Sequence, residues 1–327
     1  MQQRVVGRLG RAFSEIGLGC WQLGGDWGDV DDASAMDVLR AAADSGVTFF
    51  DTADVYGDGR SEQFLGRFLK ERSGDDVFVA TKMGRRVPQV PSNYTLDHFR
   101  AWNDRSRANL GVDRLDLVQL HCPPTEVYRS DEVFDALDTL VDEQRIAAYG
   151  VSIETVEQGL IAIERPGVAT LQVIVNAFRL KPLEELLPKA AAAGVGVIVR
   201  VPLASGLLSG KYTKDTTFGE DDHRTYNRAG DSFDVGETFA GVPFEVGLAA
   251  VDALRPLVPG GASMAQWALR WILMSDEVST VIPGARNAEQ ARANAAAADL
   301  PPLSAGDLAT VKAVYDDRIR PHVHDRW

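Results

Sequence analysis

Strand-like and helix-like segments alternate eight times along this chain, and this alternation constrains the fold more than any other feature. Short β-branched or aromatic runs, typical of buried strands, occur near residues 17–20, 47–51, 77–81, 115–120, 147–151, 171–175, 196–201 and 278–282. Helix-like segments lie at 32–43, 61–71 (with Ser61 as the N-cap), 96–110, 131–143, 154–163, 181–193, 263–274 and 287–298. Alternation of this kind predicts a parallel β/α architecture. A doubly wound sheet would give similar local patterns, but eight units fit a (β/α)8 TIM barrel, which typically needs ~250 residues.

Two segments fall outside this repeat, and we expect both to belong to a single domain spanning residues 1–327. Residues 4–16 predict a short β-hairpin that closes the bottom of the barrel. Residues 207–243, after the seventh strand, form a long polar stretch rich in Gly, Asp and Thr. Long irregular connections are uncommon and are often functional lids. A disordered insertion without function is the alternative interpretation.

Four polar residues stand where successive predicted strands end. Asp51 and Tyr56 follow the second strand, Lys82 the third and His121 the fourth. The ends of parallel strands face one side of a barrel, where the active sites of TIM barrels lie. A phenol has a pKa near ~10, and a nearby ammonium group lowers it. We therefore expect Lys82, paired with Asp51, to lower the pKa of Tyr56.

A phenol tuned in this way can give a proton to a carbonyl oxygen or take one from an alcohol. His121 would donate a hydrogen bond to the same oxygen. Such a relay would serve an aldolase, an isomerase or a carbonyl reductase equally well. Residues 17–22 begin like a dinucleotide-binding glycine motif, but Gln22 stands at the third glycine and no Walker A sequence occurs. The residues alone therefore predict a barrel enzyme with a tyrosine acid/base.

Charge and cysteine content restrict the partners and the compartment. The formal net charge is -13, which disfavours nucleic acid and anionic membrane as partners. Cys20 and Cys122 are the only cysteines, so a disulfide framework is excluded and a reducing compartment is indicated. The N-terminus shows no signal peptide, and no apolar run approaches the ~20 residues that span a bilayer. We expect a cytoplasmic enzyme without a metal site, either a monomer or a weak homo-oligomer.

Several motifs, in the correct order and spread over nearly the whole chain, resemble the aldo-keto reductase superfamily. Residues 50–57 (FDTADVYG) are similar to its aspartate and tyrosine signature, and 80–82 (ATK) and 117–121 (LVQLH) to its lysine and histidine strands. Residues 150–152 (GVS), together with Gln172, resemble its nicotinamide carboxamide site. Residues 202–212 (PLASGLLSGKY) resemble its pyrophosphate segment, and 282–287 (IPGARN), with Gln290 and Asn294, the adenosine site of its bacterial branch.

The resemblance implies a barrel that binds extended NAD(P)H, and an oxidoreductase that reduces aldehydes or ketones to alcohols. Tyr56 would be the acid/base, Lys82 and Asp51 its tuning pair, and His121 the donor that orients the substrate. Ser152 and Gln172 would hold the carboxamide. The remaining implied cofactor contacts are Gly19, Trp21, Arg200, Pro202, Leu203, Ser205, Gly206, Leu208, Lys211, Gly284, Arg286, Gln290 and Asn294.

Three positions depart from the mammalian members at the implied cofactor site. Arg200 stands where those members stack a tyrosine on the nicotinamide, and a guanidinium can also stack there. Ile153 stands where an asparagine is common. Gly284 replaces a lysine that contacts the 2′-phosphate, and Arg286 is the substitute because guanidinium suits phosphate. We therefore predict NADP(H) rather than NAD(H).

The substrate pocket is less constrained than the catalytic residues. Its predicted lining is Trp21, Trp27, Tyr56 and Phe178, with Arg85 or Arg86 from the loop after the third strand. Residues 221–224 (DDHR) could fold over the cofactor as a charged latch. The substrate would be a small carbonyl or sugar-like molecule. The alternatives are an NAD-dependent sugar or polyol dehydrogenase and a non-catalytic nicotinamide sensor.

Overall fold

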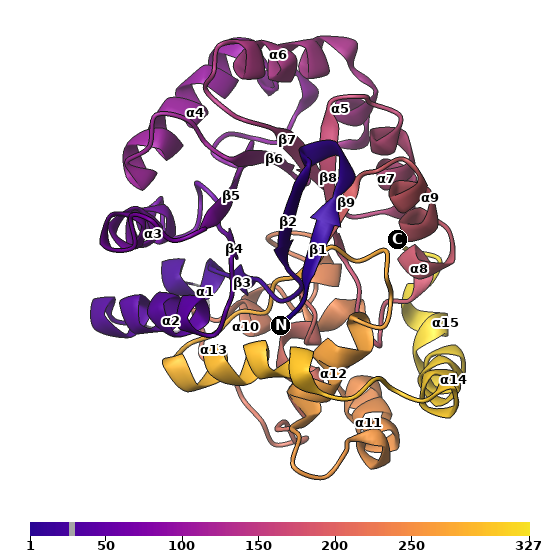
Figure 1. The fold of residues 1–327 in the computed structure, drawn as a ribbon. Coiled ribbons are helices and arrows are strands. Elements are labelled where there is room, and N and C mark those ends of the chain that lie inside the picture. The colour runs from indigo at the N-terminus through magenta and orange to yellow at the C-terminus, as the bar shows by residue number, and fades with distance from the viewer. Residues whose placement is uncertain (26–29) are drawn as a thin grey trace.

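The computed structural model describes residues 1–25 and 30–327, and its centre is a closed barrel of strands surrounded by helices (Figure 1). Eight parallel strands form one sheet in the order β10-β9-β8-β7-β6-β5-β4-β3. They are β3 (Leu18–Gly19), β4 (Phe49–Asp51), β5 (Phe78–Met83), β6 (Leu117–His121), β7 (Tyr149–Ser152), β8 (Val168–Ile174), β9 (Gly196–Arg200) and β10 (Thr280–Val281). Parallel bridges from Ile16 to Val281 and from Gly19 to Gly284 close the sheet. The predicted (β/α)8 fold is confirmed.

The helices follow the predicted segments closely, except that one predicted N-cap is wrong and one predicted helix is broken in two. They are α1 (Trp21–Gly24), α2 (Asp32–Asp44), α3 (Arg60–Glu71), α4 (Leu96–Leu110), α5 (Thr125–Arg129), α6 (Asp131–Asp142), α7 (Val156–Ile163), α8 (Lys181–Glu184), α9 (Leu186–Ala192), α10 (His223–Tyr226), α11 (Phe244–Leu254), α12 (Met264–Ile272), α13 (Ala288–Ala295), α14 (Ala305–Val314) and α15 (Arg320–Val323). The segment predicted as one helix at 181–193 is broken at Glu185, which has φ -138°. No helix of the described ranges is long and apolar enough to cross a membrane.

Ser61 does not cap α3, contrary to the prediction. The helix begins at Arg60, and Gly59 occupies the N-cap position without a side-chain hydrogen bond. The Ser61 hydroxyl is buried and donates to the Cys20 carbonyl oxygen over 2.9 Å, while it accepts from the Thr52 hydroxyl over 2.8 Å. Ser61 therefore ties the start of α3 to the ends of β3 and β4, on the side of the barrel where Asp51 and Tyr56 lie.

The predicted hairpin closes the bottom of the barrel. Strands β1 (Gln3–Val6) and β2 (Arg11–Ser14) pair antiparallel, and Figure 1 shows them crossing one end of the barrel. The Phe13 ring lies 5.0 Å from the Phe49 ring and 4.6 Å from the Phe78 ring, so the hairpin fills the barrel interior with apolar surface. Full burial of one such side chain contributes about 1.5–3 kcal/mol. The opposite end of the barrel is left for polar groups.

The stretch 207–243 is partly folded against the barrel, although most of residues 211–221 are exposed. It contains the end of a 3-10 turn (Ala204–Ser209), helix α10, and two further 3-10 turns, Val235–Glu237 and Phe239–Gly241. Its buried side chains include apolar and polar ones: Leu207, Leu208, Asp222, His223, Arg224, Asn227, Glu237, Thr238, Phe239 and Val242. The interpretation as a disordered insertion is therefore wrong for the structure described here.

Candidate active site

The two-residue period of the strands places the predicted catalytic side chains inside the barrel. Successive side chains on a strand point to opposite faces. On β5, Phe78 and Ala80 belong to the apolar cluster at the barrel bottom, and Lys82 continues the same face. On β6, Leu117 belongs to that cluster, and His121 lies four residues further on the same face. The polar groups therefore form a layer above a floor of phenyl and aliphatic side chains.

Asp51, Lys82 and Tyr56 meet in this layer as predicted. The Lys82 ammonium forms an ion pair with Asp51 and donates to the Thr52 carbonyl oxygen over 2.9 Å. It also donates to the Tyr56 hydroxyl over 3.5 Å. Lys82 is fully buried and Asp51 is 3% exposed. A buried charge needs a partner of opposite sign, and Asp51 supplies it.

Burial raises the pKa of the Tyr56 phenol above its ordinary value of 10, contrary to the expected lowering. The Lys82 ammonium opposes this rise, while the carboxylates of Asp51 and Glu237 add to it. The expected lowering took account only of the Lys82 ammonium. It left out burial and the carboxylate of Glu237, both of which raise the pKa of the phenol. A phenol with a raised pKa is protonated throughout the neutral range, which suits a proton donor.

His121 is neutral in this environment. Burial and the positive charges of Arg85, Lys82 and Arg200 hold the pKa of its imidazole well below 6.5. Its ring lies 5.9 Å from that of Tyr56 at an interplanar angle of 86°. The Nδ1 atom is buried and has no hydrogen-bond partner among the described residues. A neutral imidazole carries one N–H, so His121 can donate a single hydrogen bond toward the space beside the phenol.

Two glutamines share the second carboxylate oxygen of Asp51. Gln172 donates to it over 2.7 Å and Gln119 over 3.2 Å. Gln172 was predicted to contact the nicotinamide carboxamide, and in this structure its amide nitrogen donates to Asp51. Sequence analysis missed Gln119, although the period of β6 places it on the same face as His121. Both amides stabilise the ionised form of Asp51 and hence the ammonium of Lys82.

A cavity of about 850 Å³ runs from this polar layer to α13 and holds most of the predicted cofactor contacts. Its lining includes Gly19, Trp21, Gln172, Arg200, Pro202, Leu203, Ser205, Gly206, Lys211, Gly284, Arg286, Gln290 and Asn294. Ser152 and Leu208 are not in this lining. The Ser152 hydroxyl is fully buried and accepts a hydrogen bond from the Cys122 thiol over 3.3 Å, and Leu208 lies in the core.

The backbone that follows β9 is strained where it borders this cavity. Val201, Ala204 and Ser205 have φ values of 50°, 47° and 53°. Each such non-glycine residue costs on the order of 1–3 kcal/mol and persists only where the surrounding structure demands it. The Ser205 hydroxyl helps to hold this conformation by donating to the Glu237 carbonyl oxygen over 2.9 Å. The turn is thus held against the wall of the cavity, which Val201, Ser205 and Gly206 line.

A second cavity of about 520 Å³ lies on the other side of Tyr56 and His121. Its lining combines the aromatic rings of Trp21 and Phe233 with polar groups from several loops: Arg85, Gln89, Glu154, Ser232, Asp234 and Glu237. Phe178, predicted here, is buried elsewhere in the core. Arg86, the alternative to Arg85, pairs with Asp58 over 2.8 Å instead. Trp27 lies outside the described residues.

An ion network that sequence analysis did not predict surrounds this second cavity. Arg85 pairs with Glu237 over 3.1 Å, and Arg200 pairs with Glu154 over 2.9 Å and with Glu237 over 3.5 Å. The two arginines hold the pKa of Glu237 down to about 2. Cys122, Glu154 and Glu237 are close enough together to hold a metal ion. Burial raises the pKa of the Cys122 thiol to about 12, and the two guanidinium groups already neutralise the carboxylates, so we assign the cluster to ion pairing.

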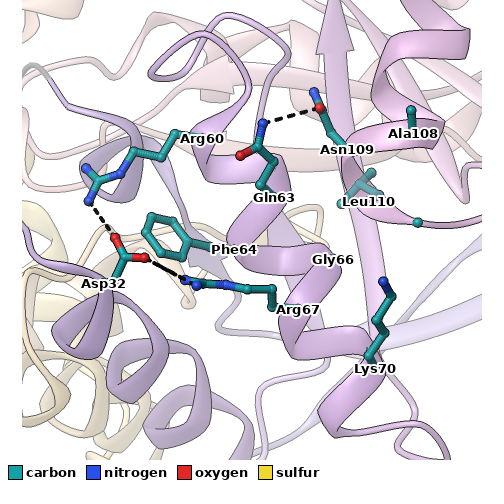
Figure 2. A pocket seen from close by; sticks show the side chains of 11 residues that line it. Asp32, Arg60, Gln63, Phe64, Gly66, Arg67, Lys70, Ala108, Asn109 and Leu110 are labelled. Atoms are coloured by element: carbon teal, nitrogen blue, oxygen red, sulfur yellow. Dashed lines mark hydrogen bonds and ion pairs between the residues drawn. The ribbon is translucent and has the colours of Figure 1, made fainter.

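A third cavity, of about 460 Å³, lies outside the barrel between α3 and α4 (Figure 2). Its cations are Arg60, Arg67 and Lys70, and Figure 2 shows Asp32 bound to the first two. Because the carboxylate of Asp32 partly neutralises the cavity, and none of the four predicted catalytic residues lines it, we assign no chemistry to it.

Asp54, two residues before Tyr56, makes the stability of the fold depend on pH. Burial, and secondarily the charge of Glu62, raises the pKa of Asp54 from 3.8 to about 7. The folded state then binds a proton that the unfolded state has released, so stability falls as pH rises from about 4 to 7. Asp54→Asn should therefore raise the free energy of unfolding by up to about 4 kcal/mol at pH 8 and leave it unchanged at pH 4. Urea unfolding at both pH values measures this, and an equal effect at both pH values would contradict it.

The family of the chain follows from comparison with known proteins. Residues 15–316 match the model of the aldo/keto reductase family. This chain belongs to that family. The aldo-keto reductase YhdN of Bacillus subtilis (strain 168) is 32% identical over 90% of this chain and 87% of its own length. A probable voltage-gated potassium channel subunit beta of Oryza sativa subsp. japonica is 31% identical over 93% of both chains.

A solved structure gives the same result. The aldo-keto reductase from Klebsiella pneumoniae in complex with NADPH superimposes with a TM-score of 0.70 at 25% identity, over 96% of both chains. The predicted family and fold are thus confirmed, and the chain is an NAD(P)H-dependent oxidoreductase.

Proposed function

We propose that this protein reduces the carbonyl group of a small, polar substrate, with NADPH as the source of hydride and Tyr56 as the proton donor. The observation that carries the proposal is the position of Tyr56 and His121, which line both the long cavity and the second cavity. A group at this junction can contact a molecule in either cavity. We assign the long cavity to the cofactor and the second cavity to the substrate.

The protonation states suit reduction. The Tyr56 phenol is protonated at neutral pH, because burial raises its pKa. As the carbonyl oxygen gains negative charge, the phenol transfers its proton, and the Lys82 ammonium stabilises the phenolate that remains. Neutral His121 donates to the same oxygen and orients it. A bound nicotinamide supplies the hydride to the carbonyl carbon.

The residues along the long cavity fit a phosphate-bearing dinucleotide. The strained turn brings Ser205 and Gly206 to the wall of the cavity, and neither Lys211 nor Arg286 forms an ion pair with a described residue. In a chain of net charge -13, two uncompensated cations beside one cavity favour an anionic ligand. The Gln290 side chain accepts from the Arg286 backbone nitrogen over 2.9 Å and fixes that residue. Arg286 is therefore the proposed contact for the 2′-phosphate.

Replacing Arg286 tests the proposed cofactor preference. Arg286→Ala should raise the dissociation constant of NADPH by roughly 10–100-fold, as expected for loss of a charge-assisted phosphate contact. The dissociation constant of NADH should change by less than about twofold. Fluorescence titration with each nucleotide measures both values. Arg292→Ala, on the exposed face of α13, is the matched control. Equal losses for the two nucleotides would refute the assignment.

The lining of the second cavity favours a hydroxylated substrate. Trp21 and Phe233 offer aromatic faces, while the carboxylates of Glu154, Asp234 and Glu237 accept hydrogen bonds from hydroxyl groups. The same residues would serve oxidation of a sugar or polyol, because the proton transfer is reversible.

The meeting of Tyr56, Lys82, Asp51 and His121 favours an enzyme over a non-catalytic nicotinamide sensor. A cytoplasmic location is part of the proposal, and the two free buried cysteines support it.

Consumption of NADPH, and separately of NADH, tests the proposed function. With glyceraldehyde as a hydroxylated substrate and 4-nitrobenzaldehyde as an aromatic one, we expect turnover with NADPH and a higher kcat/KM for glyceraldehyde. A preference for the aromatic aldehyde would contradict the proposed substrate class but leave the reaction intact. Absence of turnover with either cofactor would refute reduction and favour the sensor.

A further inference from the structure

Trp327 is buried beside the active site although it lines neither cavity. It follows α15 and is 6% exposed. The guanidinium carbon of Arg179 lies 3.6 Å from the centroid of its ring. Arg179, in the loop after β8, is itself 2% exposed, and two of its nitrogen atoms have no hydrogen-bond partner among the described residues. The charge of Asp234 and the indole face together compensate this buried cation.

The indole also contacts residues 234–241, a segment of the long connection after β9. The indole Nε1–H donates to the Asp234 carboxylate over 2.9 Å, and the same carboxylate oxygen accepts from the Gly236 backbone nitrogen over 2.7 Å. A side chain at Gly236 would collide with Arg179, and one at Gly241 would collide with the Trp327 ring. Both glycines thus allow the backbone to wrap the indole closely.

This segment carries Glu237 into the active site. Glu237 is 6% exposed and directly follows Gly236. It is one of the residues shared by the linings of the long cavity and the second cavity. Its carboxylate pairs with Arg85 over 3.1 Å and with Arg200 over 3.5 Å. The position of the Glu237 carboxylate therefore determines how far the charges of Arg85 and Arg200 are neutralised beside the active site.

We propose that Trp327 is a positioning residue of the active site, which packs against both Arg179 and the 234–241 segment and so holds Glu237 in place. Arg179 also lies directly against Gly236, and the indole supports the segment at Asp234 and Gly241. Without the indole, the segment loses its hydrogen bond at Asp234 and its apolar support. Glu237 then leaves the two arginines, and the wall of the second cavity is no longer fixed.

The first test follows the segment itself and does not depend on the proposed function. Trypsin cleaves after lysine and arginine, and the exposed Lys214 and Arg228 lie in the long connection. Trp327→Ala should increase the rate of cleavage at these two sites at least about tenfold, because local opening exposes the backbone. Asp325→Ala, at an exposed residue near Trp327 in the sequence, is the matched control and should leave the rate unchanged. A wild-type cleavage rate in Trp327→Ala would overturn the proposal.

The second test asks whether Trp327 acts through Glu237, and it rests on the proposed function. Trp327→Ala and Glu237→Gln should each lower kcat/KM for glyceraldehyde about tenfold, mainly through KM. The double variant should be no worse than Glu237→Gln alone, because coupled residues are not additive. Losses that multiply in the double variant would overturn the proposal. If the wild type shows no turnover, the proposed function fails and the cleavage test alone decides the role of Trp327.

A conservative variant covers the case in which Trp327→Ala does not fold. Trp327→Phe keeps an aromatic face for Arg179 but lacks the N–H that donates to Asp234. It should fold, and its cleavage rate should lie between those of the wild type and Trp327→Ala, about threefold above the wild type. A wild-type rate would show that the hydrogen bond does not hold the segment, which contradicts the proposed support at Asp234.

Discussion

Tyr56→Phe should lower kcat for carbonyl reduction by roughly 10²–10⁴-fold, the loss expected when a general acid is removed. The affinity for NADPH should stay within about twofold, because the substitution removes one oxygen and keeps the ring that stacks on Trp21 at a centroid distance of 5.8 Å. Single-turnover kinetics and fluorescence titration separate the two quantities. Retention of kcat with loss of affinity would show that Tyr56 binds the cofactor and does not donate the proton.

The matched control for this experiment is another tyrosine hydroxyl of the barrel. The Tyr149 hydroxyl donates to Asp138 over 2.7 Å, and Tyr149 is absent from the linings of both site cavities. Tyr149→Phe should cost about 1 kcal/mol of stability and leave kcat unchanged.

The pH dependence of kcat gives a further check on the role of Tyr56. Because burial raises the pKa of Tyr56 above 10, reductive kcat should not fall from deprotonation of this phenol until the pH exceeds 10.

The positions of Asp51, Lys82 and His121 could be predicted because each depends on local sequence. Alternate side chains of a strand point into the barrel. Where the first of these inward side chains are apolar and the last is polar, the polar group lies at the mouth of the barrel. The same reasoning applied to Gln119, two residues before His121, would have predicted its contact with Asp51. Local patterns therefore specify which residues of β5 and β6 face inward.

The ion network and the pKa of Tyr56 could not be predicted in this way. Glu237 meets Arg85 across 152 positions of sequence, and Trp327 meets Asp234 across 93. No periodicity connects residues so distant, and their contacts depend on how the long connection folds back over the barrel. The shift of the Tyr56 pKa depends on burial together with four charged neighbours, of which Asp51 and Glu237 raise the pKa while Lys82 and Arg85 lower it. A motif gives the identity of one neighbour but not the extent of burial.

Lys82→Met should destabilise the protein by about 3–5 kcal/mol, the loss typical when one partner of a buried ion pair is removed. Asp51 would remain buried at 3% exposure, with hydrogen bonds from Gln119 and Gln172 but without a compensating charge. Turnover should fall as well, by about 10²-fold or more, because the phenolate of Tyr56 would lose the ammonium that most stabilises it during proton transfer. Urea unfolding and steady-state kinetics measure the two effects separately.

The double variant Asp51→Asn/Lys82→Met separates stability from catalysis. It removes both buried charges and keeps an amide of similar size beside the two glutamines. Stability should therefore recover by most of the 3–5 kcal/mol, since replacing both partners of a buried pair with neutral groups is often nearly neutral. Turnover should stay low, because the Tyr56 phenol would still lack its ammonium neighbour. Lys189→Met, which breaks the exposed pair with Glu185, is the surface control and should leave both quantities nearly unchanged. A double variant that regains turnover would show that Lys82 serves the fold and has no part in proton transfer.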